Sequence, residues 1–381
     1  MSVKVKSVLH LDQVKGLNPA EQEKLKAVSS KYAFASNEYY LSLINWSDPK
    51  DPIRRIIVPC NEELDMWGTL DPSNEGKYTV MPGVEHKYYR TALIMVSNAC
   101  GGICRYCFRK RIFLKGKAGV VKDIDAAIRY ISDHKEITNV LLTGGDPFML
   151  ATSRLDKIVG ALRAIDHVQI IRIGTKITSY NPHRILDDPK LLDIFRKYST
   201  PDKRMYVITH FSHERELTDV ALKALAELKS AGAIIANQTP LLRGVNDDPV
   251  ALAQLFRRLS YIGNTPYYVF QCRPATGNKT FAVPVEEGYA IFEKAKSMVS
   301  GLAKRARFVM SHSSGKIEII AVTKEHTYFK YHRAAIDEDC GKIMVFRRNT
   351  QAYWLEDYGE PVLVEKLFTG LHQNVGEDEL A

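Results

Sequence analysis

Between residues 91 and 271 the chain alternates short apolar runs with longer stretches of helical period. Each apolar run has about four to six residues, the length of a buried strand. The longer stretches repeat apolar residues three or four positions apart, as on one face of a helix. This pattern predicts strands at residues 91–96, 139–142, 169–173, 205–208, 233–236 and 267–271, and helices at 126–134, 153–165, 188–198, 219–231 and 250–262.

Strands that alternate with helices pair in parallel, and the helices cover the outer face of the sheet. The catalytic residues of such folds lie where the strands end. Each predicted strand is followed by a polar or glycine-bearing loop, so six loops meet at one rim. The loops begin near residues 98, 143, 174, 210, 237 and 272.

The two flanks of this region have different patterns. Residues 1–80 are helical and irregular, with a capped helix that begins at Asn18 and Pro19. After residue 300 short strands are predicted at 307–310, 317–322, 342–346 and 353–355, and the last dozen residues form an acidic tail. We therefore expect an N-terminal extension (1–80), an α/β domain (81–300) and a small strand-rich closing domain (301–381).

Composition and charge restrict the class of protein. The chain has 381 residues and a formal net charge of +9, but its basic residues are spread along its length, which argues against a nucleic-acid partner. No apolar run is long enough for a signal peptide or a membrane span. Six cysteines are few for a disulfide scaffold. We expect a cytoplasmic protein.

Three cysteines carry the clearest chemical signal. Cys100, Cys104 and Cys107 lie within the run NACGGICRYCFRKR at residues 98–111. A [4Fe-4S] cluster normally takes four thiolates, so three leave one iron free to bind a substrate or cofactor. Zinc is the alternative, but it needs a fourth ligand, and the other cysteines are distant in sequence. The spacing therefore favours an iron–sulfur site.

The cysteine spacing, with Tyr106 before the last thiol, resembles the cluster motif of radical S-adenosylmethionine (SAM) enzymes. In order and separation, further segments resemble lysine 2,3-aminomutase and its relatives, over about residues 80–320. They are VLLTGGD (140–146), IRIG (171–174), THFSH (209–213), ANQTPLLRGVND (236–247) and PYYVFQC (266–272). The resemblance implies a partial (β/α)6 radical SAM barrel, with SAM bound at the open iron and pyridoxal 5′-phosphate (PLP) held on a lysine.

The resemblance also implies roles for individual residues. Lys316 follows the turn SHSSG (311–315) and takes the place of the PLP lysine, although the family turn is richer in glycine. Arg109 takes the place of the arginine that binds the substrate carboxylate. Further positions match the segment that binds the SAM amino group and two site-lining residues; they are Gly144, Gly145, Asp146, His210 and Gln238.

Of three departures from the family pattern, two bear on the substrate and the third, at an arginine that lies near PLP in the family, bears on the cofactor. Lysine-specific members have an aspartate after the cysteine of the sixth strand, where this chain has Arg273, and a second aspartate in the region that is here 309–312. A lysine side chain would therefore meet a like charge, so we expect a substrate that is not lysine, with an acidic amino acid preferred. The family arginine nine residues before the first cysteine is replaced by Thr91, and Arg90 is its neighbour.

We therefore predict a radical SAM enzyme that moves an amino group on an amino acid other than lysine, a small-molecule substrate, and takes its electron from a donor such as flavodoxin or ferredoxin. One alternative is a radical SAM enzyme on the same scaffold that acts without PLP on a peptide or small metabolite. A second alternative is a non-catalytic metal- and RNA-binding protein. Sequence leaves open whether the chain forms a homo-oligomer.

Overall fold

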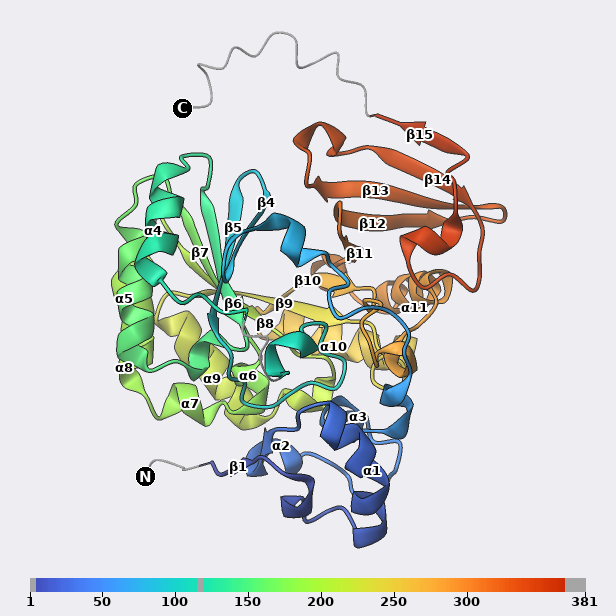
Figure 1. The fold of residues 1–381 in the computed structure, drawn as a ribbon, viewed down its shortest axis with the longest axis horizontal. Helices are drawn as coiled ribbons and strands as arrows, with labels where there is room; N and C mark the ends of the chain where they lie inside the picture. The colour runs from blue at the N-terminus through green and yellow to red at the C-terminus, as the bar shows by residue number, and fades with distance from the viewer. Residues whose placement is uncertain (1–4, 115–118, 367–381) are drawn as a thin grey trace.

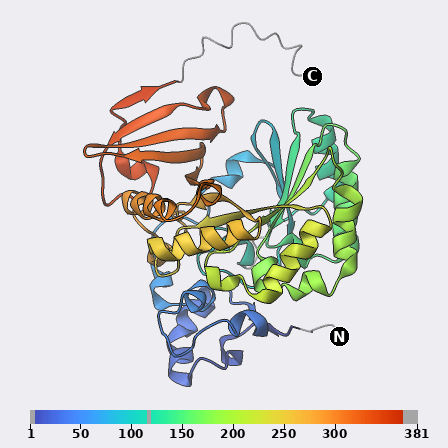
Figure 2. The same ribbon diagram turned by 180° about the vertical axis from the view of Figure 1, so that it is seen from behind.

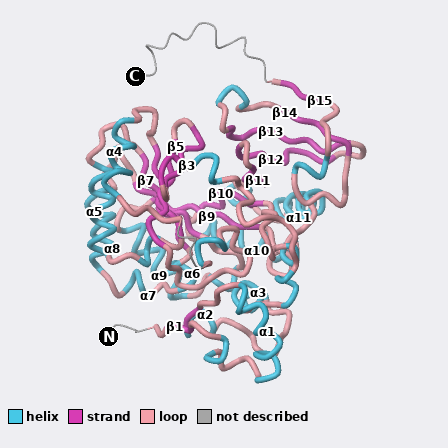
Figure 3. Tube along the Cα trace, in the orientation of Figure 1, coloured by secondary structure: helices cyan, strands magenta, loops and turns pink. Residues whose placement is uncertain are grey.

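The computed structural model of the chain describes residues 5–114 and 119–366. Its centre is a thirteen-stranded sheet that runs from β3 at one edge to β15 at the other in uninterrupted chain order (Figures 1 and 3). β1 and β2 form a separate antiparallel pair. The strands are β1 (Ser7–Val8), β2 (Ser36–Asn37), β3 (Thr79–Met81), β4 (Val84–Tyr88), β5 (Thr91–Ser97), β6 (Asn139–Gly144), β7 (Ile170–Thr175), β8 (Met205–Thr209), β9 (Ile234–Pro240), β10 (Thr265–Phe270), β11 (Arg307–His312), β12 (Gly315–Val322), β13 (His326–Ala334), β14 (Ile343–Arg347) and β15 (Leu363–Glu365).

The middle of the sheet is parallel, from β5 through β10. All six strands predicted from the apolar runs are present here. A seventh parallel strand, β11, pairs with β10. Antiparallel strands flank this region at both edges, and β3 and β15 do not pair with each other. The sheet is therefore an open, mostly parallel α/β sheet, in agreement with the expected partial barrel.

Helices cover the outer face of the parallel strands, as Figure 2 shows for α9 and α10. The five helices predicted between the strands are confirmed within two residues at each end. No helix in the described part of the chain is long and apolar enough to cross a membrane. The helices are α1 (Pro19–Lys31), α2 (Glu38–Leu41), α3 (Pro52–Ile57), α4 (Ile124–Asp133), α5 (Thr152–Arg163), α6 (Ile177–Tyr180), α7 (His183–Leu186), α8 (Pro189–Tyr198), α9 (Asp219–Ser230), α10 (Pro249–Tyr261) and α11 (Val285–Ser297).

Alternation along the strands separates the core from the inner face of the sheet. On β7, Ile171 and Ile173 are buried and belong to the core cluster formed with the covering helices. Arg172 and Gly174 occupy the alternate positions and line a cavity on the other face. Successive side chains of a strand point to opposite faces, so one strand contributes both to packing and to a site.

The N-terminal extension packs against the rim where the parallel strands end. Its helix α1 begins as predicted: the Asn18 side chain accepts from the Glu21 N–H, and Pro19 takes the first helical position. An apolar cluster joins residues of the extension, such as Tyr40 and Ile57, to Tyr180 beyond β7. The extension therefore covers one side of the loops that follow the strands.

The strand-rich region after residue 300 continues the main sheet instead of forming a separate one, through β11 to β15. The prediction of a strand at 353–355 was wrong, because a 3-10 helix begins at Leu355. The hairpin of β3 and β4 and the strands β13 and β15 were missed. The acidic tail lies outside the described residues, and the domain boundaries near residues 80 and 300 stay predictions.

Candidate functional site

A cavity of about 320 Å³ lies on the inner face of the sheet, a volume typical of small-molecule sites. Residues from all six predicted loops line it, together with residues of β4, β11, β12 and β13. The structure brings all eleven predicted site residues to this cavity, although their roles stay predictions. They are Cys100, Cys104, Cys107, Arg109, Gly144, Gly145, Asp146, His210, Gln238, Arg273 and Lys316.

The loop that carries the three cysteines follows β5 and is bonded to the N-terminal extension. The Ile103 N–H donates to the Ala35 carbonyl at 2.8 Å, and the Arg105 N–H donates to the Ile56 carbonyl at 2.9 Å. The Asn37 side chain donates to the Gly101 carbonyl at 3.0 Å. Backbone that precedes the loop in the sequence therefore determines its path.

The segment after β6 holds the same loop from the opposite side. The Gly145 N–H donates to the Ser97 carbonyl at 2.6 Å. A Cβ on Gly144, whose φ is +122°, would lie 2.4 Å from the Ser97 oxygen, and one on Gly145 would lie 2.3 Å from the Ala99 oxygen. Only glycine allows this approach of two backbones. The two glycines thus hold the cysteine loop in place as well as lining the cavity.

Asp146 organises the same corner. Its buried carboxylate accepts from the Thr175 hydroxyl at 2.8 Å and from the Lys176 N–H at 2.7 Å, and it also caps the short helix at Phe148. Burial raises the pKa of Asp146 to about 6, against the effect of these hydrogen bonds. Because its oxygens already have donors, its observed contacts position the loops around the site.

The three thiols fit an iron–sulfur cluster by their chemistry. Burial raises the pKa of Cys107 to about 11 and raises those of Cys100 and Cys104 as well. Thiolates in such surroundings need a positively charged partner, which cluster iron supplies. The Tyr180 hydroxyl donates to the Cys104 sulfur at 3.0 Å. Over residues 5–114 and 119–366, no three His, Cys, Asp or Glu side chains are already placed to hold a metal ion.

Cations beside the cysteine loop are paired with carboxylates. Lys176 Nζ lies 2.6 Å from Glu216 Oε1 and also donates to the His210 carbonyl at 2.7 Å. His210 is neutral, because burial and the nearby Lys176 lower its pKa to about 3. Arg105 and Lys110 share the buried carboxylate of Glu63, at 2.8 and 3.7 Å. Most of the basic run at 105–111 therefore has a structural partner.

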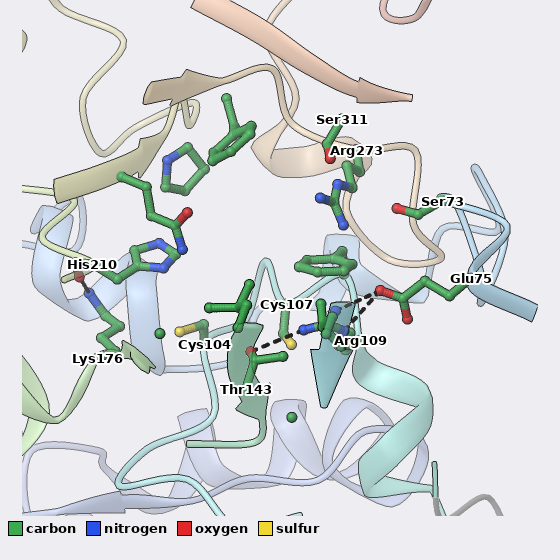
Figure 4. Close-up of a pocket in the computed structure, with 18 of the residues that line it drawn as sticks. Ser73, Glu75, Cys104, Cys107, Arg109, Thr143, Lys176, His210, Arg273 and Ser311 are labelled. Atoms are coloured by element: carbon green, nitrogen blue, oxygen red, sulfur yellow. Dashed lines mark hydrogen bonds and ion pairs between the residues drawn. The ribbon is translucent and has the colours of Figure 1, made fainter. Parts of the chain in front are cut away.

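Arg109 projects into the middle of the cavity (Figure 4). Its Nε donates to Glu75 at 2.9 Å, and its Nη1 donates to the Thr143 hydroxyl at 3.3 Å. Burial opposes ionisation of Glu75, but Arg109 and Arg111 lower the pKa of that carboxyl to about 2. Glu75 thus orients the Arg109 guanidinium. A carboxylate that enters the cavity beside Thr143 would meet this group at Nη1.

Lys316 is the second residue of β12 and lies opposite Ser311 on β11, and the two strands are joined by a tight turn. Its Nζ lies 5.1 and 4.9 Å from the ring centres of Tyr268 and Phe270. Burial and four surrounding cations hold the pKa of Lys316 well below its usual value. A lysine amine whose pKa is lowered loses its proton more readily and so becomes the nucleophile that binds an aldehyde cofactor, so the site fits PLP.

Arg273 follows β10, lines the cavity and stacks on the Phe108 ring, 3.6 Å from its centre. Burial lowers its pKa to about 10. It does not pair with Asp247 or Asp248: the former bonds to Arg243, and the latter caps α10. Figure 4 shows Arg273 beside Ser311, across the cavity from Lys176 and His210.

Several residues of the cavity were not predicted from the sequence. Glu75 and Glu85 both precede the first predicted strand; Glu75 lies in the extension expected to be helical and irregular, and Glu85 lies at the start of the expected α/β domain. Burial raises the pKa of Glu85 to about 7, and its Oε1 has no hydrogen-bond partner among the described residues. Arg172 was visible as a charge within an apolar strand. Arg333 lies on β13, a strand that was not predicted.

Comparison with known proteins extends the similarity over most of the chain. A family model of the radical SAM superfamily matches residues 94–256. A protein of Aquifex aeolicus, provisionally named L-lysine 2,3-aminomutase, is 51% identical over 363 residues, 95% of this chain and 97% of the relative. The L-lysine 2,3-aminomutase of Acetoanaerobium sticklandii is 34% identical and covers 78% of this chain and 71% of the relative. The glutamate 2,3-aminomutase of Clostridioides difficile is 34% identical and covers 80% and 71%.

Proposed function

Because the chain belongs to the lysine 2,3-aminomutase family of radical SAM enzymes, we propose that it moves the amino group of an acidic amino acid between adjacent carbons. The family uses a [4Fe-4S] cluster and SAM, and its aminomutases also use PLP. We assign the cluster to Cys100, Cys104 and Cys107 and PLP to Lys316. Family membership also favours an enzyme over the non-catalytic RNA-binding alternative.

The proposal of an acidic substrate rests on the charge of the cavity. Seven basic and three acidic side chains line it, so it attracts anions. Asp146 has its oxygens bonded within the protein, and Glu75 pairs with Arg109 and Arg111. Arg273 has no carboxylate within ion-pair distance in the described chain, so a second substrate carboxylate supplies the missing charge.

Each residue of the site has a separate task in this proposal. When bound, SAM and the cluster supply the radical that removes a hydrogen atom, and PLP stabilises the migrating nitrogen. Arg109 binds the α-carboxylate through the edge that faces Thr143. Arg273 receives the distal carboxylate, and Phe108 supports its plane. Lys316, whose pKa burial and nearby cations hold well below its usual value, holds the cofactor until substrate arrives.

The names of relatives point to two substrates. The relative named for glutamate is 34% identical to this chain, the same identity as one relative named for lysine, whereas the 51% identical protein of Aquifex aeolicus carries the lysine name only provisionally. The glutamate enzyme demonstrates that the family includes a member that acts on a dicarboxylic amino acid. Both substrates therefore occur among the names of the relatives, and the unpaired Arg273 supports the acidic one.

The first experiment locates the cofactor. Cluster-reconstituted protein is supplied with PLP without oxygen, reduced with borohydride and digested for mass spectrometry. We expect a phosphopyridoxyl group on Lys316 and none on Lys324, an exposed lysine of the β12–β13 turn. Cleavage of SAM without any labelled lysine would favour the PLP-free radical enzyme instead.

The second experiment identifies the substrate class. Glutamate, aspartate and lysine are incubated with the reduced enzyme and SAM, and β-amino products are separated by chromatography. Product from an acidic amino acid, lost in an Arg273→Met variant, supports the proposal. Preferential turnover of lysine that is insensitive to Arg273→Met would contradict it.

A further inference from the structure

Two arginines beside Lys316 lack a carboxylate partner. Arg172 donates from Nε to the Asn139 side-chain oxygen at 2.8 Å, and Arg333 donates from Nη2 to the Thr91 hydroxyl at 2.8 Å. Both acceptors are neutral, and neither arginine has a carboxylate within 4.0 Å in the described chain. Partly buried cations without a counter-ion are costly, so the site is arranged for an anion that the protein does not supply.

The sheet places Arg172, Arg333 and Lys316 on the wall of the same cavity. Lys316 and Arg333 are direct cross-strand partners of β12 and β13, so both side chains stand on the face that lines the cavity. Arg172 reaches the same face from β7, and Thr91 reaches it from the start of β5. Strands that are distant in the sequence thus place these cations on the wall of one cavity, close enough to Lys316 to affect its pKa.

The two guanidinium groups are held in place without being neutralised. The Arg333 guanidinium stacks on the Tyr88 ring, 4.2 Å from its centre, which leaves its N–H edge free to donate. Burial, and the proximity of Arg333, lower the pKa of Arg172. A dianionic group between them would relieve this repulsion and accept several charge-assisted hydrogen bonds.

We propose that Arg172 and Arg333 together bind the phosphate group of PLP, and that Arg333 supplies from β13 the charge that a threonine at position 91 cannot. The inference rests on the proposed function, because it requires PLP on Lys316. Arg109 and Arg273 are assigned to the substrate carboxylates, which leaves this pair for the cofactor. The short side chain of Thr91 both makes room for Arg333 and orients it.

The assignment is tested by comparing PLP with pyridoxal, which has the aldehyde but no phosphate. Dissociation constants of both are measured for the cluster-reconstituted protein from the absorbance of the lysine adduct, with borohydride labelling to confirm Lys316. In the wild type PLP binds more tightly. Arg333→Gln should reduce this preference roughly 10- to 100-fold, whereas pyridoxal affinity should change much less, through the pKa of Lys316 alone. Inorganic phosphate should compete with PLP in the wild type and only weakly in the variant.

Two further variants control for folding and for loss of charge. Arg90→Gln removes an exposed arginine from the adjacent β4–β5 turn and should leave both affinities unchanged. A double variant, Thr91→Arg with Arg333→Thr, moves the charge from β13 to β5. It should restore much of the preference for PLP over pyridoxal. This recovery would distinguish a phosphate contact from general damage to the sheet.

The outcomes separate this inference from the proposed function. If the wild type binds no PLP and Lys316 is not labelled, the proposed function fails. If Lys316 is labelled in the wild type but Arg333→Gln keeps the full preference for PLP over pyridoxal, only the arginine assignment fails. An equal loss of affinity for pyridoxal and for PLP would also overturn it, because a phosphate contact acts on PLP alone.

Discussion

The two ends of the cavity treat buried charge in opposite ways. Around the cysteine loop each cation has a carboxylate: Lys176 pairs with Glu216, and Arg105 and Lys110 share Glu63. Around Lys316 no such pairing exists in the part of the chain that the structure describes. Arg172, Arg273 and Arg333 have only neutral or aromatic partners.

This difference separates structural charge from charge that awaits a ligand. Pairs at the cysteine end fix the loop that presents the thiols, and they are complete before any cofactor binds. Unpaired cations at the lysine end store electrostatic free energy that an anion releases. The comparison predicts that removing a charge destabilises the protein at one end and has little or a favourable effect on stability at the other.

The largest effect should follow from Lys316→Met. Because the pKa of Lys316 lies well below its usual value, a neutral side chain of similar length fits the cavity and the fold should persist. Formation of β-amino product should fall on the order of 10³-fold or more, since the cofactor loses its attachment. Chromatography of the product measures the loss, with Lys324→Met as an unaffected control. Activity within tenfold of the wild type would remove Lys316 from the mechanism.

A stability effect of nearly the same size is expected at the other end from Glu63→Gln. Glu63 is 0% exposed and Arg105 is 1% exposed, so the change leaves a guanidinium buried without its counter-ion. Breaking such a pair costs roughly 3–5 kcal/mol of unfolding free energy. Urea unfolding followed by circular dichroism measures it. The exposed neighbour Glu62, changed to glutamine, should stay within about 0.5 kcal/mol of the wild type.

An intermediate effect is expected from Arg273→Met, and it should act on binding more than on folding. Removing a cation that has no carboxylate partner should leave thermal stability unchanged or slightly higher. The Michaelis constant for an acidic amino acid should rise roughly 10- to 100-fold, because a charged hydrogen bond to the distal carboxylate is lost. A large loss of stability would show that Arg273 is a structural residue like Arg105.

The smallest effect concerns Glu85 and depends on pH. Burial raises its pKa from 4.5 to about 7, so the folded protein binds a proton in this range that the unfolded chain has released. Wild-type stability should therefore decline as the pH rises from about 4.5 to about 7. Glu85→Gln removes this decline and should be more stable than the wild type at pH 8 by roughly 1–3 kcal/mol. Equal slopes for the two proteins below pH 7 would show that Glu85 is ionised throughout.

The sequence predicted the parallel sheet and its rim because both depend on local patterns. Apolar runs located the six central strands, and the loops after them carry Cys100, Gly144, His210 and Arg273. Lys316 was located because the turn before it resembles a family motif. Local pattern and motif were therefore sufficient for the residues that follow strands.

The charge partners could not be predicted in the same way. Glu75 meets Arg109 across 34 residues, and Arg333 meets Thr91 across 242. Such pairs depend on strand order and on β13, which was missed, and no local period encodes them. Position 91 illustrates this limit. The sequence showed that the family arginine is replaced there by Thr91, with Arg90 as its neighbour. Only the paired strands show that Arg333 donates to the Thr91 hydroxyl.

The attachment of the cysteine loop has a consequence for how the enzyme matures. Ala35 and Ile56 are already synthesised when Cys100 leaves the ribosome, but Gly145 and Tyr180, which bond the other side of the loop, are not. A nascent chain that ends before residue 145 therefore carries all three thiols on a loop that is fixed on one side only, and one that ends before residue 180 still lacks the contact to Cys104. Metal binding is coupled to folding. We therefore expect the iron–sulfur cluster to be inserted only after the ribosome has completed the N-terminal half of the chain. Chains that terminate earlier should contain no iron.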